Sequence, residues 1–456
     1  MSDYQFLVIG AGPGGYVAAL RAAKLGLKTA VVENREVGGT CLNRGCIPTK
    51  SLLHSSALLT EIQSGAKFGV TAESVRFDLA AMFARKDEVV EKLRGGILQQ
   101  FKMAKVELLR GTGMLLCPNH VRVMNADGET EYTSDNILLA TGSVPARPPI
   151  PGLDSPGVVT SDEILNGGDS LYESLAIIGG GVIGVELASF YAALGTHVTI
   201  IEALDRILPT MDREISQSMA LLLKKRGVSV HAGCRVERIE PAADGLTVHY
   251  TEKDQPAAVT ARGVLCAIGR RPNTTGLLAP GVELATERGR IVVNERFETS
   301  LPHVYAVGDV SSKVQLAHVA SAQGTAVAEL LAGEIPLCDL SAVPGCIYTE
   351  PEIACVGLTA DEAKVQGRAI KTGKCLMSAN GRTVILDGDR GFIKLVADAE
   401  TGVLLGAQLM CERATDLLSE LTNAVVNRLT VDQLKRVMRP HPTFGEAVID
   451  ALEALK

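Results

Sequence analysis

Two stretches of the chain alternate short apolar runs with a segment of helical periodicity. The first has the run Tyr4–Ile9, a helix-like segment at Tyr16–Leu25 and a second run at Lys28–Val32. The second stretch has the runs Leu175–Ile178 and Val198–Ile201 on either side of its helix-like segment. Short runs of strand formers around a helical segment are typical of strand–helix–strand units, so the pattern predicts two such units in parallel sheets.

Both units carry the same glycine turn and end on the same acidic residue. The glycines are Gly10, Gly12 and Gly15 in the first turn and Gly179, Gly181 and Gly184 in the second. In each unit a glutamate, Glu33 or Glu202, follows the last glycine by 18 positions. Such glycines permit a tight turn and close approach of a pyrophosphate, and the glutamate binds a ribose hydroxyl. One copy is weak evidence, but two copies with equal spacing predict two dinucleotides. Glu202 favours NAD over NADP, because a carboxylate repels a 2′-phosphate.

The rest of the chain predicts a joint and a different C-terminal unit. The apolar run Ile137–Ala140 leads into the proline-rich segment Pro145–Gly152, which we interpret as a joint between domains. After Pro336 the pattern changes, and strand-like runs such as Leu404–Leu409 precede helical periodicity at Ala414–Asn427 without a dinucleotide turn. This part predicts an α+β unit.

Composition excludes several classes of protein. The 456 residues, 46% of them hydrophobic, are enough for about three domains with their own cores. The net charge of −7 is mild, and no basic run indicates nucleic acid. The ten cysteines are mostly scattered and show no zinc-ligand spacing with histidine, so we expect no metal site. Scattered thiols favour a reducing compartment, which we take to be the cytoplasm.

Neither a targeting segment nor a membrane span is expected. The first strand begins at Tyr4, almost at the terminus, which leaves no signal or transit peptide. The segment Leu175–Ile201 is apolar enough to resemble a membrane span, but Glu186 and His197 interrupt it and glycines cluster at its start. We interpret it as strand, helix and strand instead.

The segment Gly38–Lys50 carries the chemistry. Cys41 and Cys46 stand five positions apart, and Lys50 follows the second cysteine by four. On an ideal helix such a pair would be separated by roughly 8–9 Å, whereas a disulfide needs Cα atoms about 4.4–6.8 Å apart. Gly39 and Gly45 could let the backbone distort enough to close the pair. Two ordinary buried thiols are the alternative, but a strained pair beside a cofactor is typical of a catalytic disulfide.

The chain resembles the pyridine nucleotide–disulfide oxidoreductases over essentially its whole length, and within that family the members that oxidise dihydrolipoamide. Further motifs support the resemblance and occur in the family's order. They are Ala140-Thr141-Gly142, Glu186 in the second fingerprint, Gly269–Asn273, Gly308-Asp309, Tyr348–Glu352 and His441–Glu446. The resemblance implies an α/β fold with two Rossmann-like domains, for FAD and NAD, and a C-terminal α+β domain that forms a homodimer. The expected bounds are 1–148 and 271–336 for the FAD domain, 149–270 for the NAD domain and 337–456 for the dimerisation domain.

The resemblance also assigns binding residues. Those expected around FAD are Gly10, Gly12, Gly14, Gly15, Glu33, Gly39, Thr40, Cys41, Lys50, Gly113, Thr141, Gly142, Ser143, Asp309, Gln315, Leu316, Ala317 and His318. Those expected around NAD are Gly179, Gly180, Gly181, Val182, Ile183, Gly184, Glu186, Glu202, Val236 and Gly269. Gly113 is the weaker candidate, on the adenine side.

The implied activity is the oxidation of a protein-bound dihydrolipoyl group with NAD⁺. A substrate thiol must first lose its proton, because only a thiolate attacks a disulfide. We expect His441 to be the base, oriented by Glu446. The thiolate would attack Cys41 and release Cys46 against the flavin. Lys50, paired with Glu186, would hold positive charge there, unless it is a solvated surface lysine. The expected partner is a lipoyl-bearing protein of a 2-oxo acid dehydrogenase or glycine cleavage complex.

Two departures and three alternatives accompany this prediction. Ala317–Gly324 lacks an acidic run common in relatives, and Phe444-Gly445 replaces Leu-Ser before Glu446. A glutathione reductase-like activity is disfavoured by Glu202, and mercuric reduction by the absence of a cysteine pair at Ala451–Lys456. A non-enzymatic flavin sensor would need a damaged catalytic set, whereas the predicted set is complete.

Overall fold

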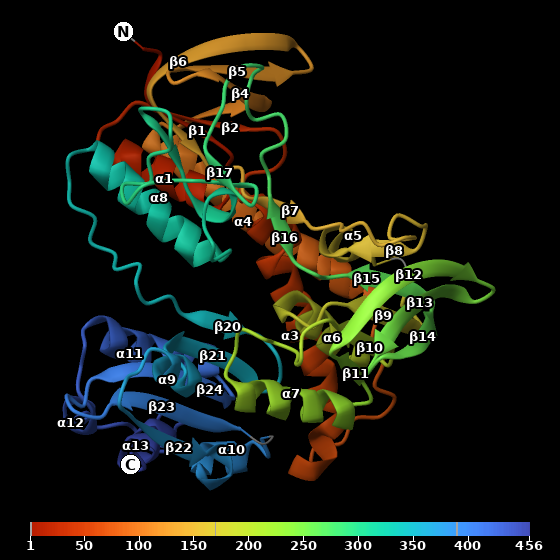
Figure 1. Ribbon diagram of the computed structural model, residues 1–456. Coiled ribbons are helices and arrows are strands. Elements are labelled where there is room, and N and C mark those ends of the chain that lie inside the picture. The colour runs from red at the N-terminus through yellow and green to blue at the C-terminus, as the bar shows by residue number, and fades with distance from the viewer. Residues whose placement is uncertain (1, 169, 389–390) are drawn as a thin grey trace.

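The computed structural model describes residues 2–168, 170–388 and 391–456. Figure 1 shows three regions: the N-terminal module at the top, a second module on the right and the C-terminal unit below. An extended segment without helix or strand runs from α8 down to β20 along one side.

The first module is built on a parallel sheet with an antiparallel extension. Its parallel strands run in the order β3-β2-β1-β6-β19, and β6 continues into a meander with β5 and β4. The strands are β1 (Tyr4–Ile9), β2 (Thr29–Glu33), β3 (Glu107–Arg110), β4 (Thr112–Cys117), β5 (His120–Asn125), β6 (Gly128–Leu139) and β19 (Val304–Ala306). The helices are α1 (Pro13–Lys24), α2 (Gly39–Arg44), α3 (Cys46–Ser64), α4 (Leu79–Ala104) and α8 (Ala317–Leu331), with short 3₁₀ turns at Gly65–Phe68 and Gly308–Val310.

Helix α1 begins three residues before the predicted Tyr16, because a proline at the first helical position loses no hydrogen bond. It crosses α8 so closely that a side chain on Gly324 would reach to 2.2 Å from the carbonyl oxygen of Gly14. The late strand β19 and helix α8 therefore complete the module that β1 begins.

The second module repeats the design. Its parallel sheet has the order β11-β10-β9-β15-β8, with a separate antiparallel sheet β12-β13-β14. The strands are β8 (Val158–Thr160), β9 (Ser174–Ile178), β10 (His197–Glu202), β11 (Ser229–Ala232), β12 (Cys234–Ala242), β13 (Gly245–Glu252), β14 (Gln255–Ala261) and β15 (Gly263–Cys266). The helices are α5 (Ser161–Asn166), α6 (Val182–Ala193) and α7 (Arg213–Lys225).

The apolar segment Leu175–Ile201 is thus strand, helix and strand, as predicted. Among the described helices, none is both long and apolar enough to cross a membrane.

Short strands connect the two modules. β7 (Ser143–Pro145) pairs antiparallel with β16 (Arg270–Pro272), where the chain enters and leaves the second module. β17 (Thr286–Glu287) and β18 (Arg290–Ile291) form a small ladder beyond them.

The C-terminal unit is an antiparallel sheet of order β20-β21-β24-β23-β22 with helices around it. The strands are β20 (Gly345–Ile347), β21 (Glu352–Gly357), β22 (Ile370–Leu376), β23 (Phe392–Asp398) and β24 (Leu404–Cys411). The helices are α9 (Ala360–Val365), α10 (Gly381–Ile385), α11 (Ala414–Val426), α12 (Val431–Lys435) and α13 (Glu446–Glu453), with a 3₁₀ turn at Met377–Ala379. This is the α+β unit that the sequence predicts.

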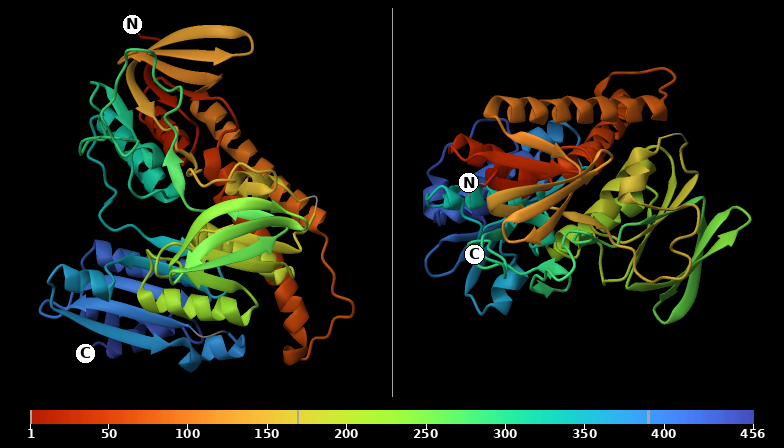
Figure 2. Two further views of the ribbon diagram at one scale, coloured as in Figure 1. Left: turned by 45° about the vertical axis from the view of Figure 1, so that its right-hand side comes forward. Right: turned by 90° about the horizontal axis from the view of Figure 1, so that it is seen from above.

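One hydrophobic core joins all three regions. It contains Leu52 of α3, Phe83 of α4, Phe190 of α6, Met219 of α7 and Ile353 of β21, each buried. Helix α6 of the second module contacts α3, and α7 contacts β24 of the C-terminal unit. Figure 2 shows the three regions from two further directions. The redox segment at the start of α3 therefore lies at a packed junction of three regions.

Candidate functional site

A single glycine separates the two helices that carry the cysteines. Helix α2 ends at Arg44, and α3 begins at Cys46, while Gly45 lies between them with φ −147° and ψ −112°. A side chain on Gly45 would stand 2.9 Å from the carbonyl oxygen of Thr40. Gly45 therefore lets the two helices meet end to end, which is the backbone distortion that the spacing requires.

The two sulfurs are in contact and differ in acidity. Both residues are free thiols in the structure, Cys41 half-buried and Cys46 exposed. The hydrogen bond from Cys41 lowers the pKa of Cys46 to about 7, and the charge of Lys50 acts in the same direction. The same hydrogen bond, together with burial, raises the pKa of Cys41 well above its usual range. Cys46 is thus the more acidic of the two thiols.

Lys50 is held by Glu186 from the second module. Its Nζ lies 2.9 and 2.8 Å from the two carboxylate oxygens of Glu186, which is only 3% exposed. The backbone N–H of Tyr348 donates to the same carboxylate at 2.9 Å, and the Tyr348 ring lies 4.9 Å from Lys50 Nζ. Lys50 is therefore not a solvated surface lysine, and the expected pair with Glu186 is present. All three regions contribute to this cluster.

The two glycine turns are near copies of each other. Side chains on Gly15 and Gly184 would collide with the carbonyl oxygens of Gly10 and Gly179, at 1.8 and 2.0 Å. Gly10 and Gly179 adopt positive φ, at 105° and 110°.

The glutamates also take matching positions. Glu33 accepts from the N–H of Ala11 at 2.8 Å, and Glu202 accepts from the N–H of Gly180 at 2.6 Å. Each glutamate thus supports its turn.

Both turns fit a dinucleotide. Gly12 and Gly181 immediately precede helices α1 and α6, which have no side-chain cap and no acidic residue in the first turn. Their first N–H groups are available to a pyrophosphate, which the helix dipole also favours. Glu33 is the last residue of β2, and Glu202 is the last residue of β10. Each therefore lies at the carboxyl end of a strand in its own sheet, where a ribose hydroxyl would lie.

Near the first turn, Asp309 forms a polar cluster with Ser143. The Ser143 hydroxyl donates to the Asp309 carboxylate at 2.6 Å. Burial raises the pKa of Asp309, while the Ser143 hydrogen bond and the Arg270 charge oppose that rise. Thr141 donates its hydroxyl to the carbonyl oxygen of Asn273 at 2.6 Å.

The other predicted flavin residues are positioned as follows. Leu316 precedes the first residue of α8, Ala317, and His318 contacts the Pro344 carbonyl oxygen through Nε2 at 2.8 Å. In the segment without the acidic run, Gln323 accepts a hydrogen bond from the N–H of Gly308 at 2.9 Å. Gly113 packs against the strands, where a side chain would stand 3.0 Å from Ile9.

In the second module, Val236 lies on β12 at a bulge. Gly269 follows β15 with φ 120°.

His441 and Glu446 form a hydrogen-bonded pair. His441 Nδ1 lies 2.8 Å from Glu446 Oε1, and the other carboxylate oxygen accepts from the N–H of Thr443 at 2.9 Å. Both contacts lower the pKa of Glu446, and the hydrogen bond from the Thr443 N–H has the larger effect. Phe444 is buried in the C-terminal core, and Glu446 is the first residue of α13. With Phe444-Gly445 in place of Leu-Ser, Glu446 still contacts the His441 imidazole. The His441 side chain is 79% exposed, so it is not buried against the redox segment of its own chain.

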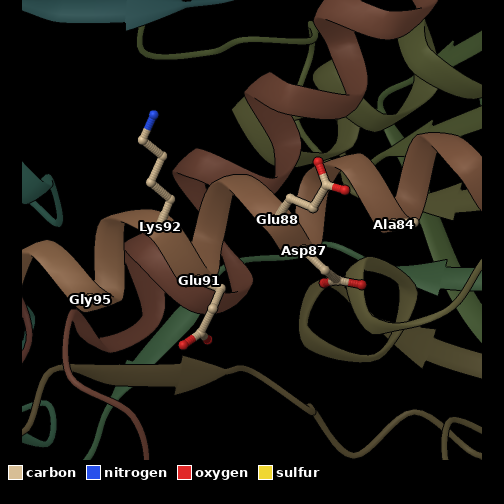
Figure 3. Close-up of a pocket in the computed structure, with 6 residues that line it drawn as sticks. All are labelled: Ala84, Asp87, Glu88, Glu91, Lys92 and Gly95. Atoms are coloured by element: carbon tan, nitrogen blue, oxygen red, sulfur yellow. The ribbon is translucent and has the colours of Figure 1, made fainter.

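Sequence reasoning missed two residues of this site. Tyr348 and Arg270 both belong to motifs that the sequence shows, but no pattern indicates which of their atoms contact Glu186 or Ser143. A surface hollow lined by Ala84, Asp87, Glu88, Glu91, Lys92 and Gly95 lies along α4, and Figure 3 shows all six residues on this one helix. It contains no predicted site residue.

Comparison with known proteins decides the family. The model described as "Pyridine nucleotide-disulphide oxidoreductase" matches residues 4–324, and the dimerisation domain of that family matches residues 343–452. The chain belongs to the pyridine nucleotide-disulphide oxidoreductase family. The predicted fold class is therefore confirmed, and FAD and NAD(H) follow as the cofactors of a flavoprotein disulfide oxidoreductase.

Several relatives within the family cover the whole chain. A dihydrolipoyl dehydrogenase of Thermus scotoductus is 42% identical over 100% of this chain and 98% of its own length. One of Bacillus subtilis is 39% identical over 99% and 97%. Among solved structures, the HOCl-induced flavoprotein disulfide reductase RclA of Escherichia coli has a TM-score of 0.89 and 30% identity, over 99% of this chain and 100% of that one.

Proposed function

We propose that this protein oxidises dihydrolipoamide to lipoamide with NAD⁺ as acceptor, acting on lipoyl groups carried by a partner protein. The relatives that are about 40% identical over the full length bear that activity in their names. The observation that carries the proposal is the cluster of Cys41, Cys46, Lys50 and Glu186. In this cluster two sulfurs lie beside a lysine that is paired with a glutamate of the second module, an arrangement that supports a thiol relay where the two modules meet.

The residues of this chain divide the reaction between them. His441 takes the proton from the first substrate thiol at Nε2, since its Nδ1 is engaged by Glu446. In the oxidised form of the pair, the substrate thiolate attacks the Cys41 sulfur of the Cys41–Cys46 disulfide, a new S–S bond forms, and Cys46 leaves as a thiolate. The second substrate thiolate then attacks the substrate sulfur of that mixed disulfide, which frees cyclic lipoamide and leaves Cys41 reduced.

The acidity of Cys46 supports this division. The Cys41 hydrogen bond and the Lys50 charge both lower the pKa of Cys46, and the Lys50 charge remains beside it when Cys41 is bound to substrate, so this charge stabilises the leaving thiolate. Bound FAD supplies the two-electron relay between the dithiol form of the pair and NAD⁺. Gly10–Gly15, Glu33 and Asp309 would hold FAD, and Gly179–Gly184 with Glu202 would hold NAD⁺.

We propose further that the site is complete only in a homodimer. The chain carries the family's dimerisation domain, and its His441 is exposed in the single chain. A second copy would bring its own His441 to the redox segment. The lipoyl-bearing partner and a cytoplasmic location remain part of this proposal, and the scattered cysteines of the sequence favour a reducing compartment.

Steady-state assays test the proposal directly. We expect turnover of free dihydrolipoamide with NAD⁺, and little turnover of glutathione disulfide with NADPH, because Glu202 repels a 2′-phosphate. Preference for the second pair would refute the assignment. Failure of dihydrolipoamide to bleach the flavin band would favour a non-enzymatic role.

Changing His441→Gln tests the base. Removal of a general base lowers turnover by about 10²–10⁴-fold, so dihydrolipoamide oxidation should fall in this range. Reduction of ferricyanide by NADH, which needs no thiol deprotonation, should stay near the wild-type rate. A loss of dithiol turnover below threefold would remove His441 from the mechanism.

A further inference from the structure

Arg270 lies at the junction of the first and second modules and takes no part in the proposed thiol chemistry. It is the first residue of β16, where the chain leaves the second module, and its side chain is 12% exposed. Its Nη1 lies 3.5 Å from Asp162 of α5, which belongs to the same module. Its Nη2 lies 3.5 Å from the Thr40 hydroxyl, next to Cys41.

The strongest contacts of Arg270 are with Ser143 of β7. Arg270 Nε donates to the Ser143 hydroxyl oxygen, and Nη2 donates to the Ser143 carbonyl oxygen, both at 2.8 Å. Two parallel donors from one planar guanidinium fix both the backbone and the hydroxyl rotamer of that serine. A lysine, with one rotatable ammonium group, could not reproduce this geometry.

The hydroxyl of Ser143 passes this constraint to Asp309. Because its oxygen accepts from Arg270, its proton is free to be donated, and it is donated to the Asp309 carboxylate at 2.6 Å. Ser143 is 5% exposed, so little water can compete for these bonds. The contacts therefore form one directed chain from Arg270 through Ser143 to Asp309.

We propose that Arg270 is a positioning residue for the flavin: it fixes the Asp309 carboxylate through Ser143 and ties the exit strand of the second module to the redox segment. This inference deepens the proposed function and rests on FAD bound beside Asp309. It makes Arg270 act on cofactor binding without entering the thiol chemistry. The neighbouring Arg271 offers a matched control, because it lies on the same strand and is exposed.

The test compares Arg270→Met, Arg270→Lys, Ser143→Ala and the double variant Arg270→Met/Ser143→Ala with Arg271→Met as the control. Dissociation of FAD from each holoprotein is followed by the recovery of flavin fluorescence on dilution. The flavin absorbance band is recorded at saturating FAD, and the thermal midpoint of each apoprotein reports folding.

We expect Arg270→Met to weaken FAD binding by about tenfold or more, the size that follows from losing a hydrogen bond to a charged group. Arg270→Lys should recover part of the loss, and Ser143→Ala should weaken binding in the same direction. The double variant should be no weaker than Arg270→Met, because both changes break one chain. The flavin band should shift in Arg270→Met but not in Arg271→Met.

Additive losses in the double variant would overturn the route through Ser143. An Arg270→Met protein that matches Arg271→Met in FAD binding and absorbance would overturn the inference as a whole. If Arg270→Met fails to fold, the milder variant Ser143→Ala tests the inference instead. Wild-type FAD binding by Ser143→Ala would refute the hydrogen-bonded route from Arg270 to Asp309. Wild-type protein that holds FAD but does not oxidise dihydrolipoamide would refute the proposed function and leave this inference standing.

Discussion

The first and second glycine turns share a backbone but differ in what covers them. A side chain on Gly39, in the redox segment, would stand 2.6 Å from the Cα of Gly12, so the first turn is closed over by the start of α2. In the second turn, a side chain on Gly181, the position that corresponds to Gly12, would meet nothing within 4 Å, whereas one on Gly12 would stand 3.8 Å from the Cα of Gly39. The first turn is covered by another segment of the chain, and the second turn is left uncovered at Gly181.

This difference matches the two roles of the nucleotides in the family. FAD stays with the enzyme through many turnovers, so its turn can be closed over by the segment that also carries the cysteines. NAD⁺ must enter and leave in each cycle, so its turn has to stay accessible. Under the proposed assignment the same sequence fingerprint serves a resident FAD and an exchanging NAD⁺, and the segment that covers only the first turn sets the distinction.

The largest expected effect is at the covered turn. In Gly39→Ala the new methyl meets the Cα of Gly12, and φ at this position is +59°. Left-handed strain of roughly 1–2 kcal/mol and overpacking of roughly 1–3 kcal/mol together weaken FAD binding by about 100-fold. Gly181→Ala should keep its flavin and raise only the Michaelis constant for NAD⁺. Equal flavin loss in both variants, measured by FAD retention on dilution, would abolish the contrast.

The two glutamates provide a smaller and more symmetric test. Glu202→Ala should raise the Michaelis constant for NAD⁺ about tenfold, while Glu33→Ala should weaken FAD binding by a similar factor, because each loses a charged acceptor. Steady-state kinetics and FAD titration separate the two outcomes. A Glu202→Ala enzyme with an unchanged Michaelis constant for NAD⁺ would show that the ribose contact does not form.

The smallest effect concerns the thiol beside the covered turn. The pKa of Cys46 is lowered from its usual value to about 7, so in the reduced enzyme its thiolate is present above about pH 7 and is lost below it. Alkylation of Cys46 by iodoacetamide should therefore follow a midpoint near pH 7. Lys50→Met removes a charge that favours the thiolate and should move the midpoint upward. A midpoint near 9 in the wild-type enzyme would contradict the assigned acidity.

The sequence predicts the repeating parts of this molecule well, because they follow from local rules. The glycine turns, the strands around them and the spacing to Glu33 and Glu202 each depend on fewer than about 30 consecutive residues. The need for a backbone break between the cysteines follows from helix geometry, and Gly45 supplies it.

What the sequence could not predict depends on contacts between distant segments. The Tyr348 N–H reaches Glu186 across 162 positions, and Arg270 reaches Ser143 across 127. Such pairs depend on how the modules dock, and no local periodicity encodes that docking. The close approach of Gly39 to Gly12 likewise depends on how the redox segment packs on the first turn. Neither the glycine turn nor the redox segment predicts that contact on its own.

The common core shared by α3, α6, α7 and β21 has a consequence for how the molecule comes apart. None of the three regions can expose its face of that core without stripping apolar surface from the other two. Melting should consequently occur as one cooperative transition, and a protease should find no cut that releases an intact nucleotide module. The proposed relay between sulfur and nicotinamide would then last only as long as the whole chain stays folded.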